Sequence, residues 1–146
     1  MAVPAEHGLW SVHFHSHTMG VIGLLDYALA TNDNSLKEFV ASFYTYSKNF
    51  GIARIGFFPN VIGSLESMHK WAASYTGERD AGVCDEGCAV ADMTWIAATL
   101  SEAGVGDYWD DVNQYVRNHL SEHQVLRRDL LEDGGGHGRH RLRAAL

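Results

Sequence analysis

Long apolar runs are absent from this sequence, and proline and cysteine are scarce. No apolar run approaches the roughly 18 residues that a membrane-spanning helix needs, so we predict no membrane partner. The two prolines, Pro4 and Pro59, fall in segments predicted to be irregular. Two cysteines are too few for a disulfide scaffold. The N-terminus has no basic region and no apolar signal core, which predicts a cytoplasmic protein.

Positive charge is also scarce. The chain of 146 residues has 11 lysines and arginines against 18 acidic residues, and its net charge is −7. This balance argues against a nucleic-acid partner. The last residues carry Arg139, Arg141 and Arg143 without an acid, so the rest of the chain is more acidic still. Such a body repels phosphate and tolerates cations or neutral substrates.

Apolar residues recur at helical spacing over most of the chain, and no pair of strands is predicted. The pattern predicts five helices, at about residues 18–29, 35–50, 64–75, 86–102 and 107–132. Short connections make neighbouring helices antiparallel hairpins. We therefore predict one all-α domain over residues 1–133. The Gly-, Arg- and His-rich segment 134–146 is predicted to be a flexible tail outside it.

Several local signals set the expected ends of these helices. Ser35 with Glu38 three residues later is a capping box, and Asp107 is the expected N-cap of the last helix. The apolar segment 52–60 is predicted to be a loop or short strand that crosses one end of the helices. It contains Arg54, which would need an anionic partner if buried, although a surface arginine is the simpler interpretation.

The stretch from Cys84 to Asp92 combines two thiols and three carboxylates and then enters an apolar helix. The cysteine spacing is compatible with a shared metal, a reactive thiol or a plain reduced pair. Asp92 lies inside the helix, where burial would raise its pKa and fit it to act as an acid. The alternative is that Asp92 hydrogen-bonds a neighbouring loop.

A second polar cluster alternates along the chain as His13, His15 and His17. In an extended segment all three imidazoles would share one face. Both this stretch and Glu86 with Cys88 precede core helices, so the two can converge. His13, His15, Glu86 and Cys88 would suit zinc. The alternative is that the histidines hydrogen-bond in a substrate groove or a helix cap.

Three blocks of the sequence together resemble the (α/α)-toroid glycoside hydrolases, in particular the β-L-arabinofuranosidase-like group and its uncharacterised relatives. The blocks are residues 13–16 (HFHS) with 24–33 (LLDYALATND), 51–59 (GIARIGFFP), and 84–93 (CDEGCAVADM) with 100–111 (LSEAGVGDYWDD). They span most of residues 12–123. The resemblance implies antiparallel helical hairpins like a segment of an (α/α)6 toroid. Such a segment would leave an apolar face open, so we expect a homo-oligomer.

The resemblance also implies a chemistry. Arabinofuranosidases of this type take zinc ligands from a Glu-x-Cys motif, and Glu86-Gly87-Cys88 occupies its place. A later cysteine pair supplies their remaining ligand and nucleophile, whereas this chain has no cysteine after Cys88. We therefore expect hydrolysis of a glycosidic bond in a carbohydrate substrate by carboxylate acid/base chemistry, with metal assistance from zinc as an added possibility. The alternative is a non-catalytic helical module or truncated fragment that oligomerises through its open apolar face.

The expected roles follow from these two interpretations. Glu86, Asp92 and Cys88 are the predicted catalytic residues. The predicted substrate-binding residues are His13, His15, Arg54 and Trp109, the last as an exposed aromatic platform. Glu86, Cys88, His13 and His15 are the predicted metal ligands.

Overall fold

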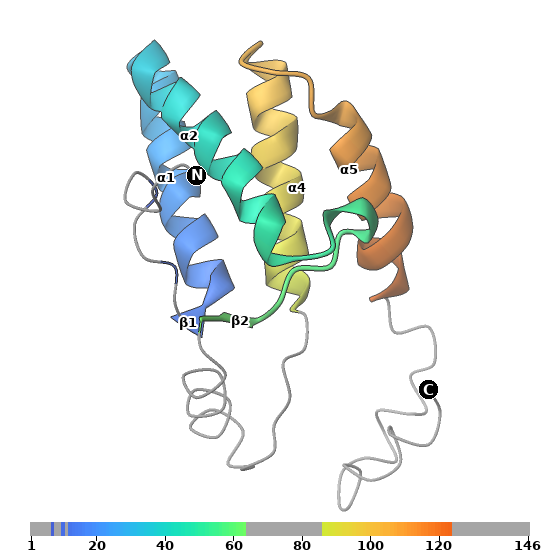
Figure 1. Cartoon of the computed structure of the whole chain (residues 1–146). Helices are drawn as coiled ribbons and strands as arrows, with labels where there is room; N and C mark the ends of the chain where they lie inside the picture. Colours follow the sequence, from blue (N-terminus) through green and yellow to red (C-terminus); the bar gives the residue numbers. More distant parts are fainter. Residues whose placement is uncertain (1–6, 8–9, 11, 64–85, 124–146) are drawn as a thin grey trace, which may run out of the picture.

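The computed structural model describes residues 7, 10, 12–63 and 86–123. They form a helical bundle with one short strand pair (Figure 1). This confirms the all-α prediction, and the arrangement as part of a toroid stays a prediction. The predicted helix at 64–75, Cys84, Asp85 and the tail at 134–146 lie outside the described residues. No helix in the described part of the chain is both long and apolar enough to cross a membrane.

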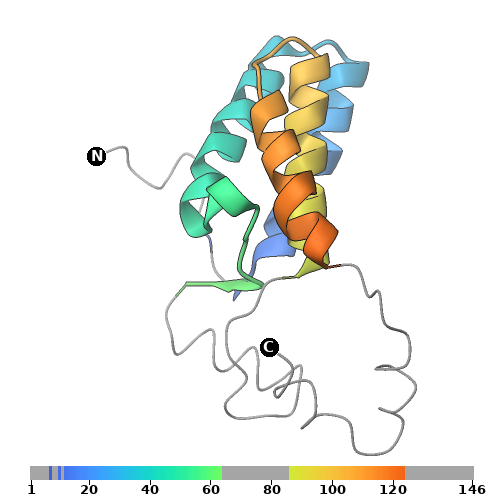
Figure 2. The ribbon, with the colours of Figure 1, turned by 90° about the vertical axis from the view of Figure 1, so that its right-hand side faces the viewer.

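Within the described residues, four α-helices build the bundle. They are α1 (Phe14–Ala30), α2 (Asn34–Ser47), α4 (Gly87–Glu102) and α5 (Trp109–Tyr115). Helices α1 and α4 lie side by side and run in the same direction, whereas α2 and α5 run the opposite way (Figures 1 and 2). Helix α4 packs against α1, α2 and α5, so it is the centre of the bundle.

The core of α4 follows the predicted stripe. Val90, Met93, Ile96, Ala97 and Leu100 are all buried, with Ala89 beside them. Their spacing of three and four residues places them on one side of the helix. Burying a side chain of this size contributes on the order of 1.5–3 kcal/mol each. The agreement extends to the boundary, because the helix ends at Glu102 as predicted.

The start of α1 differs from the prediction of an extended histidine stretch. The helix begins at Phe14, so His15 and His17 lie in its first turn. The Phe14 amide donates to the Asn60 carbonyl at 3.0 Å, and the Phe14 ring is fully buried. At 100° per residue, side chains two positions apart point to opposite sides of a helix. His15 and His17 therefore do not share a face, and that prediction was wrong.

The caps of α2 and α5 also differ from the prediction. The N-cap of α2 is Asp33, whose side chain accepts from the Leu36 amide at 3.1 Å. Ser35 therefore lies inside the first turn of the helix and does not form the predicted capping box. The N-cap of α5 is Tyr108 and not Asp107. An aspartate at the N-cap satisfies an otherwise unpaired helix amide, which is why Asp33 can replace the serine in this role.

The segment after α2 crosses one end of the bundle, as predicted (Figure 1). It comprises the 3₁₀ turns η2 (Lys48–Phe50) and η3 (Ala53–Ile55) and strand β2 (Val61–Ile62). Strand β2 pairs antiparallel with β1 (Val12–His13), a pairing that the sequence did not predict. Phe58 is fully buried. The centroid of its ring lies 5.5 Å from that of Phe14 and 5.4 Å from that of Tyr115. The crossing segment therefore ties α1 to α5.

A buried polar network joins α2 to α5. The Tyr44 hydroxyl donates to Asp111 Oδ2 at 2.7 Å and lies 3.1 Å from the Tyr115 hydroxyl, while Lys48 Nζ donates to the same Asp111 oxygen at 2.7 Å. Asp111 Oδ2 is the shared acceptor of this network. Burial, with Tyr115 as the next cause, raises the pKa of Tyr44 far above its usual range.

Tyr44→Phe should destabilise the protein by about 1–3 kcal/mol, because it removes a hydroxyl that is buried and hydrogen-bonded. The raised pKa of Tyr44 means that the folded state holds the phenol proton more tightly. The free energy of unfolding should therefore fall as pH rises above 10, the usual value, and Tyr44→Phe should reduce this slope. Urea titration at pH 7 to 11 measures both. Tyr27→Phe at an exposed tyrosine is the control, and equal losses in the two variants would contradict the prediction.

Candidate active site of paired imidazoles and carboxylates

The parallel packing of α1 and α4 brings their N-terminal ends together, and two histidine–carboxylate pairs form there. His13 Nε2 lies 2.7 Å from Glu86 Oε2, and His15 Nδ1 lies 2.6 Å from Asp92 Oδ2. The two imidazole rings are 5.6 Å apart at an interplanar angle of 74°. Four residues predicted from the sequence therefore lie in one cluster, named below the imidazole–carboxylate cluster: His13, His15, Glu86 and Asp92.

Asp92 is the most buried member of the cluster. Its side chain is 12% exposed, against 24–27% for the other three. The Thr18 hydroxyl donates to Asp92 Oδ2 at 2.5 Å, the same oxygen that contacts His15. Oδ2 of Asp92 therefore faces two groups that can donate to it. In the tautomer of His15 that donates from Nδ1, the Nε2 lone pair faces no partner among the described residues.

Glu86 occupies the N-cap position of α4 and has two neighbours on one oxygen. Its Oε2 contacts His13 Nε2, and the Cys88 thiol donates to it at 3.3 Å. His13 Nδ1 in turn lies 2.9 Å from the Ser16 hydroxyl. Ser16 and Thr18 were missed from the sequence, although each lies three residues after a histidine, the spacing at which side chains in a helix meet.

The thiol of Cys88 is protonated at neutral pH. Burial, together with its hydrogen bond to Glu86, raises the pKa of Cys88 from 9.0 to about 11. A thiolate is the form that attacks a substrate or binds a metal. In this arrangement Cys88 is a hydrogen-bond donor to Glu86, and its predicted catalytic role stays a prediction.

The predicted zinc ligands do not converge as a metal site in the described residues. No group of three or more histidine, cysteine, aspartate or glutamate side chains in that part of the chain surrounds a point that would hold a metal ion. The potential ligands hydrogen-bond to one another instead, His13 and Cys88 both to Glu86. Zinc binding stays a prediction, and no step proposed below depends on it.

Two other predicted substrate residues lie elsewhere in the fold. Arg54 is exposed in η3, and Trp109 is 48% exposed at the start of α5. Both elements lie on the α5 side of α4, across from α1 (Figure 1). No contact recorded for the described residues joins either side chain to the imidazole–carboxylate cluster, so their predicted role has no support from this geometry.

Comparisons with known proteins do not identify the chain. No protein-family model, no curated protein and no solved structure matches it. The resemblance to toroid glycoside hydrolases therefore stays a prediction from the three sequence blocks. Function has to be inferred from the chemistry of the cluster itself.

Alkylation of Cys88 should be slow at pH 8 and should rise towards a midpoint near pH 11, because only the thiolate reacts and the raised pKa keeps its fraction small. Iodoacetamide labelling followed by mass spectrometry measures this rate in a Cys84→Ser background. Glu86→Gln should shift the midpoint towards the usual value of 9.0, since it removes the carboxylate charge beside the thiol. If the alkylation rate of the protein with Glu86 intact has its midpoint at or below pH 9, the prediction is contradicted.

Proposed function

We propose that the protein hydrolyses glycosidic bonds by acid/base chemistry at the imidazole–carboxylate cluster. The observation that supports this most is the pair of acidic groups at one end of α1 and α4, each held by an imidazole and each partly open to solvent. Glycoside hydrolysis needs one group that protonates the leaving oxygen and another that activates water. The acidic net charge of −7 is compatible with a neutral sugar.

The roles divide according to the hydrogen bonds. Glu86 keeps Oε1 without a partner among the described residues, so a protonated Glu86 can present its proton there. We assign His15 the tautomer that donates from Nδ1 to Asp92. Its Nε2 lone pair can then accept a proton, as a general base must. His15 removes a proton from water as the new C–O bond forms at the anomeric carbon. The bond to the leaving oxygen breaks as that oxygen takes the Glu86 proton, and proton exchange with water restores both groups.

The test is turnover of a panel of nitrophenyl glycosides by the full chain. We expect release of nitrophenol from at least one member, with a bell-shaped pH profile because one group must be protonated and another deprotonated. Circular dichroism shows whether the sample is folded. A folded sample that turns over no member of the panel would overturn the proposal.

A second function is favoured by a different observation. Large apolar side chains are exposed where η3 packs against α5. They belong to η3 and its N-cap residue, to α5, and to the π-helical turn η4 (Val116–Leu120) that continues α5. They are Ile52, Ile55, Trp109 and Val116, each between 39% and 57% exposed. Such a surface suits self-association by a non-catalytic module. Light scattering tests it, and a monomer at high concentration would exclude it.

A further inference from the structure

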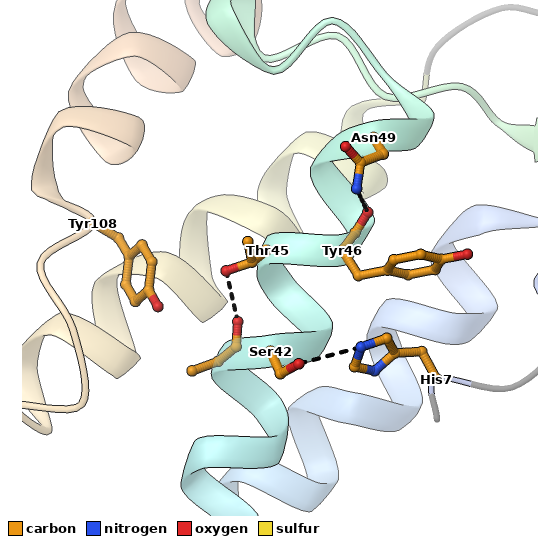
Figure 3. A pocket seen from close by; sticks show the side chains of 7 residues that line it. His7, Ser42, Thr45, Tyr46, Asn49 and Tyr108 are labelled. Atoms are coloured by element: carbon orange, nitrogen blue, oxygen red, sulfur yellow. Dashed lines mark hydrogen bonds between the residues drawn. The ribbon is translucent and has the colours of Figure 1, made fainter. Parts of the chain in front are cut away.

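A shallow groove runs along the outer side of α2, and we propose that it binds a neutral saccharide. Its volume is about 410 Å³, within the range of small-molecule sites. Figure 3 shows His7 and Tyr46 on one side of the groove, Tyr108 on the other, and Ser42 and Thr45 between them. The proposal rests on these residues alone and does not depend on the proposed hydrolase function.

The floor of the groove is made of short side chains. Ala41, Ser42 and Thr45 lie on the side of α2 away from its buried residues, and Asn49 follows them in η2. The last three are exposed. Thr45 donates within its own helix to the Ala41 carbonyl at 2.9 Å, and Asn49 donates to the Tyr46 carbonyl at 2.9 Å. The side-chain oxygen Oδ1 of Asn49 therefore stays available to accept from a ligand hydroxyl.

The walls of the groove are aromatic rings held by packing. The His7 ring stacks on the Tyr46 ring with 4.9 Å between their centroids. The Tyr108 ring packs edge to face against the ring of buried Tyr44, with 5.0 Å between their centroids. Flat, immobilised rings with polar groups between them suit a ligand that has both an apolar face and hydroxyl groups. A sugar ring has both, with its C–H bonds on one face and hydroxyl groups at its edge.

The charge of the groove selects against ionic ligands. Among the lining residues that the structure describes, only His7 can carry a charge at neutral pH, and none of them is a carboxylate, a lysine or an arginine. His7 Nε2 lies 3.2 Å from the Ser42 hydroxyl, so the ring also orients a floor residue. An ionic sugar would find no fixed opposite charge here, and the net charge of −7 would repel an acidic one.

The groove is separate from the imidazole–carboxylate cluster. The Trp10 ring stacks on the His17 ring with 4.8 Å between their centroids, and its centroid lies 6.2 Å from that of Tyr46. Trp10 therefore connects the groove residue Tyr46 to the side of α1 that carries His17. His15 points to the opposite side of the same helical turn. Binding in the groove should therefore persist when the cluster is altered.

The experiment is a heteronuclear NMR titration of the full chain with neutral trisaccharides of glucose, xylose and arabinose. We expect saturable shifts of the amides of residues 41–49 and Tyr108 for at least one of them. Thr45→Lys places a long charged side chain in the groove and should raise Kd at least about tenfold, because Thr45 bonds only within its helix and can be replaced without unfolding α2. Ser35→Lys, exposed on α2 outside the groove, should leave Kd within about twofold.

Three results would overturn the proposal. They are no saturable shift at these amides up to about 50 mM sugar, equal affinity in Thr45→Lys and the unchanged protein, and tighter binding of a trigalacturonate than of every neutral sugar. Asp92→Asn separates this site from the hydrolase proposal. That variant should bind sugar in the groove normally, whereas shifts lost in Asp92→Asn would place the ligand at the cluster.

Discussion

Asp92→Asn should lower kcat on the best nitrophenyl glycoside by about 10²–10⁴-fold, the range that general acid or base catalysis contributes. The asparagine is almost the same size, but it no longer supplies the negative charge that holds the His15 Nδ1 proton. An asparagine amide can donate to Nδ1 instead, which places the His15 proton on Nε2, the nitrogen that should take a proton from water. The loss should fall on kcat and leave KM nearly unchanged, because His15 acts on water.

Glu102→Gln is the matched control for Asp92→Asn. Glu102 is an exposed acid at the other end of the same helix, so its neutralisation changes net charge equally and leaves the cluster intact. Urea titration of both variants shows whether Asp92→Asn is still folded, since its oxygen also accepts from Thr18. An Asp92→Asn protein that is folded and retains the kcat of the unchanged protein would exclude His15–Asp92 as the base.

The leaving group distinguishes the role of Glu86 from that of Asp92. A dinitrophenolate leaves without protonation, so Glu86→Gln should be nearly as fast as the unchanged protein on a dinitrophenyl glycoside. The same variant should be much slower on a phenyl glycoside, because its leaving oxygen needs the proton. Asp92→Asn should slow both substrates. If Glu86→Gln slows both substrates equally, Glu86 is not the acid.

Gly51→Ala should destabilise the protein by about 3 kcal/mol or more, the upper part of the range for overpacking. An added Cβ at Gly51 would lie 2.1 Å from the Phe57 carbonyl oxygen and 2.8 Å from Phe58 Cδ1. The Phe57 oxygen cannot retreat easily, because it accepts from the Ile52 amide at 2.9 Å. Phe58 is fully buried between α1 and α5, so the cost reaches the core.

Gly20→Ala provides the control for Gly51→Ala. An added Cβ at Gly20 meets nothing within 4 Å, and alanine inside α1 should stabilise the helix by about 0.5–1 kcal/mol. Urea titration followed by circular dichroism measures both variants, which should move the midpoint in opposite directions. If the Gly51→Ala midpoint stays at that of the unchanged protein, the close approach at Gly51 does not constrain the fold.

The sequence predicted α4 well and the start of α1 poorly, for a physical reason. The stripe from Val90 to Leu100 is a local pattern that one buried helix side explains. The phase of the histidines depends on Phe14, whose amide is capped by Asn60 and whose ring packs on Phe58. Both partners lie more than forty residues away, and no local pattern reports them.

The candidate site shows the same division. The expectation that His13 would meet Glu86 needed only that both residues precede core helices, and the 2.7 Å contact agrees with it. The contact of Thr18 with Asp92 could be predicted only if the helix was known to start at Phe14. Both His15 and Thr18 are then helical, and their spacing of three residues places them on one side of α1. The network of Tyr44 and Lys48 on Asp111 joins helices far apart in the chain, and nothing local marks it.

The parallel arrangement of α1 and α4 has a consequence for the order of folding. The α1–α2 hairpin has a short turn and can form from nearby residues, whereas His13 and Glu86 are separated by 73 positions. During synthesis, α1 and α2 leave the ribosome before Glu86 has been added to the chain. We therefore expect the hairpin to form early and the histidines to receive their carboxylates late, so the imidazole–carboxylate cluster exists only in chains that have completed folding.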